Sequence, residues 1–400
     1  EPAWARWGAD PDRPEFTLGL EEEVMLLTPG SWTLAQTIDE VLLELSPELA
    51  EHVTAETHRA ALELGSGIHP TAGAAAAELM SLRARLAEEL APLGLRVAAA
   101  GTHPFTLWQE TRVSDGARYQ LLYGSLRELA RREPTFALHV HVGVSTAARA
   151  VSLLNRLRTH LPLLLGLSAN SPYWQGRDTG LASTRVPVFQ AFPRVGIPRR
   201  FRDYEDYIET VDLLIRSGAF PEATFLWWDI RLQPRFGTVE IRIMDSQTRV
   251  QDTAALLALV QSLARLELEE GFACEALIDA PELLDENRFL AVREGVDAHL
   301  IDPERASMVP LRQHLADLLA LCYPHAAELG CAGELADVSD LARCGGASRQ
   351  RELARESGSL PGLVGSMSDL FVGEVGGAPP PYGIAAAGLG PKARVRQAQL

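Results

Sequence analysis

The sequence predicts an α+β protein, in which helices accompany a few strands that each have one apolar face. In residues 136–144, every second residue from Phe136 to Val144 is apolar, which is the period of a strand packed on one side. Residues 16–27 and 238–244 show the same pattern. Longer segments between them are typical of helices. We therefore expect the strands to share a sheet whose apolar face lies against helices.

The other elements are predicted in chain order. The expected helices are 35–46, 71–94 with Thr71 as N-cap, 117–132, 147–166, 203–217, 252–271 and 305–329, with further helical segments to about 370. A further strand is expected at 95–100 and a hairpin at 225–232 and 238–244. Residues 1–15 are predicted to form an arm, 16–372 a single catalytic domain, and 373–400, rich in Gly, Pro and Ala, a disordered tail.

The composition is that of an ordinary globular protein, with 46% hydrophobic and 22% charged residues among 400. The formal net charge of −16 argues against nucleic acid or an anionic membrane as the main partner. A local cationic pocket for phosphate remains compatible with it.

The basic residues are almost all arginine, and Lys392 is the single lysine. This excludes a P-loop lysine, a protein-kinase strand lysine and a Schiff-base lysine from the body of the chain. Nucleotide chemistry here must therefore use arginine, histidine and metal ions.

The cysteines show no C-x-x-C spacing, so we expect reduced thiols in a cytoplasmic protein and neither a zinc site nor disulfides. They are Cys274, Cys322, Cys331 and Cys344. No apolar run reaches the length of a membrane span, and the first residues lack a signal-peptide core. We expect no membrane partner.

Three predicted strands carry polar residues at positions i and i+2 opposite an apolar face. The pairs are Glu21 with Glu23, His139 with His141, and Glu240 with Arg242. Taken singly, each pair fits a solvated strand face or a cross-strand ion pair. If the strands share a sheet, however, all three pairs line one surface.

Glu56 and Glu63 bring the set to five carboxylates and two imidazoles. So many carboxylates cannot lie together unless cations neutralise them. Oxygen ligands with one or two histidines favour Mg²⁺ or Mn²⁺ over a structural zinc, and such ions keep positions open for substrate phosphates. The sequence therefore predicts a site for metal and nucleotide.

Five stretches in order carry a resemblance to the bacterial carboxylate–amine ligases related to glutamate–cysteine ligase, also called glutamate–cysteine ligase type 2. They are TLGLEEEVMLL, AAGTHPF, HVHVGV, LSANSPYWQGRDTGLASTR and TVEIRIMDSQT. The resemblance runs from about Phe16 to about Leu353, and GASRQREL is a weaker match. It implies a curved antiparallel sheet of the glutamine synthetase catalytic-domain type, flanked by helices, with ATP, divalent ions and glutamate on its concave face.

The resemblance also implies roles for individual residues. The metal ligands would be Glu21, Glu23, Glu56, Glu63, His139 and Glu240. Arg242, His141 and Arg185 would act in catalysis, and Arg177, Arg231 and His141 would bind the nucleotide, although the arginines are not ranked by the sequence. The implied reaction is phosphorylation of the glutamate side chain by ATP and attack of an amine, with cysteine as the reference acceptor. A homodimer is a further expectation.

Three smaller features complete the analysis. The long irregular segment 168–185 could close over an acyl phosphate and exclude water. His103, in a Gly-Thr-His-Pro turn, is expected to have a structural role. Glu22 interrupts the apolar face of its strand, and nothing in the sequence explains it.

Three rival functions remain at this level. An ATP:guanidino kinase uses similar residues but forms no amide. A metal-dependent hydrolase also uses an H-x-H strand, but such sites usually need further His and Asp ligands. A catalytically inactive relative is disfavoured because all of the polar positions above are present.

Overall fold

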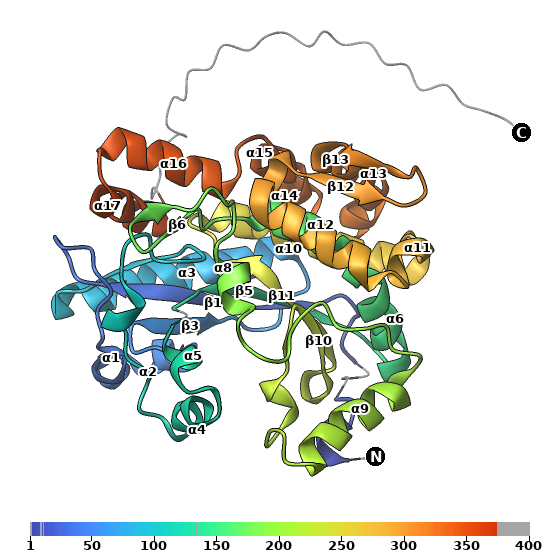
Figure 1. Ribbon diagram of the computed structural model, residues 1–400, viewed down its shortest axis with the longest axis horizontal. Helices are drawn as coiled ribbons and strands as arrows, with labels where there is room; N and C mark the ends of the chain where they lie inside the picture. Colours follow the sequence, from blue (N-terminus) through green and yellow to red (C-terminus); the bar gives the residue numbers. More distant parts are fainter. Residues whose placement is uncertain (1, 9, 11, 133, 374–400) are drawn as a thin grey trace, which may run out of the picture.

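A single antiparallel sheet forms the centre of the protein, as seen in the computed structural model, which describes residues 2–8, 10, 12–132 and 134–373 (Figure 1). Its strands are β1 (Leu18–Leu27), β2 (Val53–Ala55), β3 (Ala61–Gly65), β4 (Arg96–Ala98), β5 (Ala137–Gly143), β10 (Ile230–Gln233) and β11 (Thr238–Asp245). Their order is β10-β11-β5-β1-β3-β2, and β4 pairs with the end of β1. The expected α+β class with an antiparallel sheet flanked by helices is confirmed.

Helices and small sheets surround this centre. The longer helices are α3 (Ala72–Leu90), α4 (Ala117–Leu126), α6 (Ala147–Leu157), α7 (Leu161–Ser168), α9 (Tyr204–Arg216), α10 (Val250–Glu269), α12 (Pro281–Glu294), α13 (Leu311–Leu329), α16 (Gly346–Ser357) and α17 (Leu360–Phe371). The shorter helices are α1 (Ile38–Glu44), α2 (Pro47–Ala50), α5 (Glu128–Arg131), α8 (Arg185–Phe189), α11 (Glu275–Ile278), α14 (Ala332–Ala336) and α15 (Val338–Arg343). The small sheets pair β6 (Tyr173–Trp174) with β7 (Arg177–Asp178), β8 (Val195–Gly196) with β9 (Trp227–Trp228), and β12 (His299–Asp302) with β13 (Ser307–Pro310).

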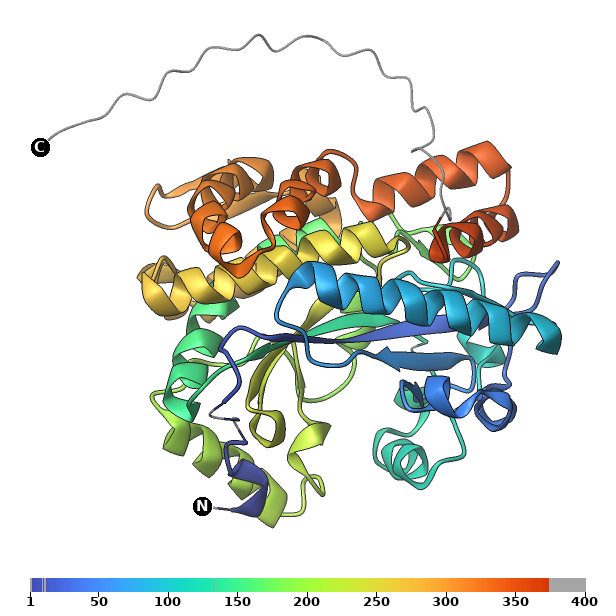
Figure 2. The same ribbon diagram turned by 180° about the vertical axis from the view of Figure 1, so that it is seen from behind.

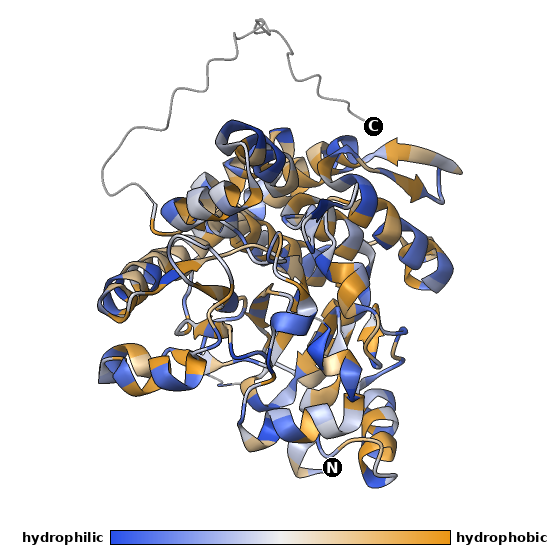
Figure 3. Ribbon diagram, turned by 60° about the vertical axis from the view of Figure 1, so that its left-hand side comes forward, coloured by the Kyte–Doolittle hydropathy of each residue, from blue (hydrophilic) through white to orange (hydrophobic). Residues whose placement is uncertain are grey.

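Helices α3 and α10 cover the apolar face of the sheet, where the two-residue period of β1, β5 and β11 directs aliphatic side chains (Figure 2). The outer helices alternate hydrophilic and hydrophobic residues, as expected for helices that pack on one face (Figure 3). Helices α4, α5 and α9 lie on the opposite side of the sheet (Figure 1). The polar strand positions point to that side, which we call the functional face.

Glu22 points into the apolar face, and Arg83 of α3 explains it. The two side chains form a fully buried bidentate pair, with Nη2 of Arg83 2.6 Å and Nε 2.7 Å from the carboxylate oxygens. Arg83 also donates to the carbonyls of Gln247, Thr248 and Phe371. This pair joins β1 to α3, to the segment after β11 and to the end of α17.

Three predicted helices differ from the structure in their bounds, and one helix was not predicted. The helix expected at 117–132 is interrupted at Arg127, whose φ of 58° is incompatible with a right-handed helix. The helix expected at 147–166 contains a 3₁₀ turn, Arg158–His160. The helix expected at 305–329 begins at Leu311, because the preceding residues form β13. The sequence analysis did not predict α12.

The predicted arm packs against the sheet through Trp7, whose indole Nε1 donates to the carbonyl of Val144. The predicted disordered tail lies outside the described residues, except for Gly373. The extent of one catalytic domain from 16 to 372 remains a prediction.

The four cysteines have free thiols, as expected. Among the described residues, none of the helices has the length and apolarity needed to cross a membrane.

Candidate functional site

Strand register brings the predicted polar residues together on the functional face. Glu21 of β1 is paired with His139 of β5, and Glu23 is paired with Glu63 of β3. On the other side of β5, Glu240 of β11 is paired with His141. Because side chains of paired residues lie on the same face, residues far apart in the sequence form one row across four strands.

His139 is at the centre of this row. Its Nδ1 lies 3.1 Å from Glu21 Oε2 and 4.0 Å from Glu240 Oε1, and its Nε2 lies 3.8 Å from Glu23 Oε1. Burial and the nearby Arg242 cation lower the pKa of His139 to about 4. The ring is therefore neutral at neutral pH, the form in which imidazole binds metals.

Two groups of acidic side chains share His139. Glu21 and Glu240 form one group with it, and Glu23 and Glu63 form the other. In each group the possible ligand atoms lie within 4.8 Å of one another. The side-chain Nε2 atoms of His139 and His141 are buried without a hydrogen-bond partner among the described residues.

On the β3 side, Glu23, Glu56 and Glu63 form no ion pair with an arginine of the described residues, and the more distant Arg185 and Arg242 offset their crowding only in part. Burial, reinforced by the charge of Glu56, raises the pKa of Glu23 to about 8. Burial also raises the pKa of Glu56 and, with help from Glu21, Glu56 and Glu23, raises that of Glu63 well above its usual range. These carboxyls would ionise readily only if a cation were added.

The opposite end of the row is rich in cations. Burial disfavours the charged form of Glu240, but Arg231 and Arg242 outweigh it and hold the pKa of this carboxyl well below its usual range. Nε of Arg231 donates to Glu240 Oε2 at 2.6 Å, and Arg242 donates to Glu240 Oε1. A β-bulge between Ile241 and Met244 places an extra residue opposite β5, so that Arg242 lies against His139, with Nη1 3.4 Å from Nδ1.

Segment 168–185 reaches the site through Arg185. The buried guanidinium of Arg185 donates to the carbonyls of Arg242 and Ile243 and lies 3.9 Å from Asp245 Oδ1. Asp245 accepts hydrogen bonds from the hydroxyls of Ser171 and Ser183. Both ends of the segment are thus fixed to the end of β11, while its middle, the β6–β7 hairpin, is largely exposed.

The structure places three of the predicted site residues outside the two groups that share His139. Arg177 is exposed on the β6–β7 hairpin and makes none of the contacts that join the row. Arg231 directs its donors at Glu240 and at the carbonyls of Thr224 and Leu226, so the structure places it behind Glu240. Glu56 lies near the row but belongs to neither three-residue group.

The structural role expected for His103 is confirmed. Its Nε2 lies 2.8 Å from the carbonyl of Trp32, and its Nδ1 accepts from the backbone N–H groups of Phe105 and Thr106. Both ring nitrogens are therefore used to hold the turn. Burial lowers the pKa of His103 to about 4, so it stays neutral.

The sequence analysis missed Asp229, which has the same signal as the residues it found. Every second side chain here points to the functional face: that of Asp229, just before β10, and those of Arg231 and Gln233 within it. Gln233 donates to Glu240 Oε2 at 2.6 Å. The signal was weak because the preceding Trp227 and Trp228 hide the alternation.

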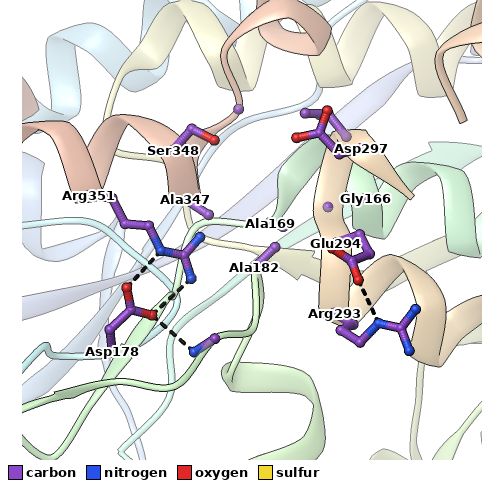
Figure 4. Close-up of a pocket in the computed structure, with 14 residues that line it drawn as sticks. Gly166, Ala169, Asp178, Ala182, Arg293, Glu294, Asp297, Ala347, Ser348 and Arg351 are labelled. Atoms are coloured by element: carbon purple, nitrogen blue, oxygen red, sulfur yellow. Dashed lines mark hydrogen bonds and ion pairs between the residues drawn. The ribbon is translucent and has the colours of Figure 1, made fainter. Parts of the chain in front are cut away.

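A cavity of about 460 Å³ is lined in part by segment 168–185 (Figure 4). Its floor consists of Gly166, Ala169 and Ala182, and two ion pairs face each other across it. One of these pairs joins Asp178 of the β6–β7 hairpin to Arg351 of α16 at 2.9 Å. This cavity contains none of the residues of the row, but its wall includes the exposed part of the segment.

Comparisons with known proteins agree with this arrangement. The sequence model of glutamate–cysteine ligase family 2 matches residues 17–368. A Rubrobacter xylanophilus protein named "Putative glutamate--cysteine ligase 2-1" is 39% identical over 87% of this chain and 93% of its own length. A Sorangium cellulosum protein named "Putative glutamate--cysteine ligase 2" is 39% identical over 85% of this chain and 91% of its own.

The fold is shared with a Francisella tularensis glutamate–cysteine ligase solved in complex with AMP, at a TM-score of 0.67 and 15% identity over 91% of this chain and 90% of that one. A bifunctional glutathione synthetase from Pasteurella multocida aligns with a TM-score of 0.67 and 13% identity, over 90% of this chain and 52% of that one. Fold, site and relatives together define an ATP-dependent carbon–nitrogen ligase that joins a carboxylate to an amine. The chain belongs to glutamate–cysteine ligase family 2.

Proposed function

We propose that this protein forms a γ-glutamyl amide from glutamate and an amine or amino acid, with ATP as the phosphoryl donor and γ-glutamyl phosphate as the intermediate. The observation that carries the proposal is the row of carboxylates centred on His139, with Arg242 beside it. We infer the substrate class from the names of the two sequence relatives above, each of which is named as a putative glutamate–cysteine ligase 2.

The residues of the row fit Mg²⁺ or Mn²⁺. Glu23, Glu56 and Glu63 are crowded carboxyls that form no ion pair with an arginine of the described residues. The Nε2 of neutral His139 is buried there without a hydrogen-bond partner. We propose two cation sites, one at Glu21, His139 and Glu240, the other at Glu23 and Glu63 with Glu56 close by. When bound, the ions would neutralise phosphate charge and orient the transferred group.

The arginines supply the remaining positive charge. Nε of Arg242 and Nε of Arg185 have no hydrogen-bond partner among the described residues, although both side chains are largely or fully buried. These donors are suited to a phosphoryl group or a substrate carboxylate, because guanidinium binds both in a planar fashion. Arg231 and Gln233 would act through Glu240 by fixing its orientation.

Phosphoryl transfer needs positioning and charge neutralisation more than covalent help from the protein. The γ-carboxylate of glutamate attacks the terminal phosphorus of ATP, and ADP leaves. The amine then attacks the acyl carbon, and phosphate leaves. Water must be excluded between the two steps, and we propose that the β6–β7 hairpin covers the site at that stage.

The test is ATP turnover by the purified protein with Mg²⁺ and glutamate, first alone and then with a panel of amino acids and simple amines. Products are identified by mass spectrometry, and Glu23→Gln protein prepared in parallel controls for contaminating ATPases. ADP together with a γ-glutamyl amide is the expected result and identifies the acceptor.

Other products would contradict the proposal in distinct ways. A phosphorylated amine would indicate a guanidino-type kinase. An amide from a carboxylate other than glutamate would keep the mechanism but replace the donor. Hydrolysis of a substrate without ATP would indicate a metal-dependent hydrolase.

A further inference from the structure

The cavity of about 460 Å³ beside segment 168–185 is used by none of the steps proposed above (Figure 4). Its volume lies within the usual range for small-molecule sites, about 300–1,000 Å³. Its floor is made of small buried residues, among them Gly166, Ala169, Ala182 and Ala347, and charged side chains lie around this floor. Such a cavity suits a small polar molecule with a short apolar part.

Two walls of the cavity each carry charges of both signs. On one wall, Arg351 of α16 donates from Nε and Nη2 to the carboxylate of Asp178, in both cases at 2.9 Å. On the opposite wall, at the end of α12, Nε of Arg293 donates to Oε1 of the adjacent Glu294 at 2.6 Å. Figure 4 shows these two pairs facing each other across the floor.

The lining as a whole carries three carboxylates and two guanidiniums, because Asp297 adds to these two pairs. Asp297 is paired with Arg312 from outside the lining, at 2.5 Å from its Nη1. The lining therefore has no excess of positive charge with which to attract a phosphate or another polyanion. A ligand with one charge of each sign can instead face a group of opposite sign on each wall.

The two walls differ in the end of the helix dipole that they present. Within the described part of the chain, Arg351 uses Nε and Nη2 for Asp178 and the carbonyl of Leu181, and its Nη1 makes no hydrogen bond. On the same wall α16 begins at Gly346 without a side-chain cap, so the positive end of its dipole lies there. On the opposite wall α12 ends at Glu294, and the negative end of its dipole lies there.

We propose that this cavity binds an α-amino acid, or the α-amino acid end of a γ-glutamyl product, as an effector. Both occupants present an ammonium and a carboxylate on one carbon. The carboxylate lies at the start of α16 beside Nη1 of Arg351, and the ammonium lies at the end of α12 beside Glu294 and Asp297. Because Asp178 and Gly180 line the cavity, the occupant adds contacts that hold the β6–β7 hairpin in place. Binding needs neither ATP nor the row, so a free amino acid binds whether or not the proposed function is correct.

The test is isothermal titration calorimetry of the purified protein with the common L-amino acids and, in a second arm, with γ-glutamylalanine, both without ATP and Mg²⁺. The first arm detects a free amino acid, and the second detects a product-like ligand. The tightest ligand is then compared with two analogues, one without the ammonium group and one without the carboxylate. Each analogue is expected to bind at least about tenfold more weakly, since it leaves one wall without its partner.

Variants of α16 locate the binding. Ser348→Trp fills the cavity from its rim, leaves both ion pairs in place and should abolish binding. Arg351→Met should weaken binding at least about tenfold. Arg355→Met, one turn further along α16 and outside the lining, is the matched control and should bind as the unmodified protein does. Arg242→Ala should also leave binding unchanged, and loss of binding there would place the amino acid in the row and overturn the inference.

Limited proteolysis supplies the second readout. The bound ligand should slow cleavage of the β6–β7 hairpin in the unmodified protein but not in Ser348→Trp protein. Binding that survives Ser348→Trp, analogues that bind as tightly as the parent ligand, or no binding at about 10 mM would each overturn the inference. If Ser348→Trp does not fold, Arg351→Met and its control decide the question. Binding without any ATP turnover would leave this inference standing while the proposed function fails.

Discussion

Metal binding at the row should depend steeply on pH, because the carboxyls that would bind the ion hold protons in the metal-free protein. Glu23, with a pKa of about 8, is half protonated at pH 8 and almost wholly protonated at pH 6. If the ion binds only the ionised form, this one group weakens the apparent Mg²⁺ affinity by about fiftyfold between pH 8 and pH 6, or about 2 kcal/mol. Glu56 and Glu63, whose pKa values are also raised, make this a lower bound.

Isothermal titration calorimetry with Mg²⁺ at pH 6, 7 and 8 measures the effect directly. Repeating the titration in buffers of different ionisation enthalpy gives the number of protons released. Glu23→Gln should bind more weakly at pH 8 and show a shallower pH dependence. Glu48→Gln, which changes an exposed carboxylate outside the row, is the control and should behave as the unmodified protein does. Equal affinities at pH 6 and 8, within a factor of two, would refute the reasoning.

The same carboxyls determine how stability without metal depends on pH. A carboxyl whose pKa is raised on folding stabilises the protein below its unfolded pKa, and this contribution is lost as the pH rises through the folded value. For Glu23 the loss extends from about pH 4.5 to about pH 8. The metal-free protein should therefore melt at lower temperature at pH 8.5 than at pH 6.5, and Mg²⁺ should raise Tm more at the higher pH.

Three further predictions concern other contacts. Glu22→Leu should lower the free energy of unfolding, measured in urea, by about 3–5 kcal/mol, because it leaves the buried cation of Arg83 unpaired. Adding Arg83→Met should recover most of this loss. A double variant no more stable than the single one would contradict this account. Arg242→Ala should lower ATP-dependent turnover by at least about 100-fold with an unchanged circular dichroism spectrum, and an unfolded variant would count against its role. Asp178→Asn should reduce stability by less than about 1 kcal/mol, since the ion pair with Arg351 is partly exposed, but should speed proteolysis of the β6–β7 hairpin. ATP, Mg²⁺ and glutamate together should slow that cleavage, and no protection would count against a covering role for the hairpin.

Local pattern was enough to find most of the row. The two-residue period assigned Glu21, Glu23, His139, His141, Glu240 and Arg242 to the polar faces of strands, because side-chain direction in a strand depends only on parity. The same pattern also contained Asp229, which was not recognised beside two tryptophans. Helix bounds failed at Arg127 and before Leu311, where a positive φ and a β-hairpin reflect long-range packing that propensity does not encode.

By itself the sequence determined which side chains share a strand face and that lysine takes no part in the body of the chain, and it predicted that the carboxylates bind cations. The tertiary structure alone decided which faces meet. Register set His139 between two acidic groups, and a one-residue bulge turned Arg242 toward it. Glu22 had no explanation until Arg83, distant in sequence, was placed against it. Pairing partners and burial are properties of the assembled sheet and its helices, and they fix the pKa values and the free donors on which the chemistry depends.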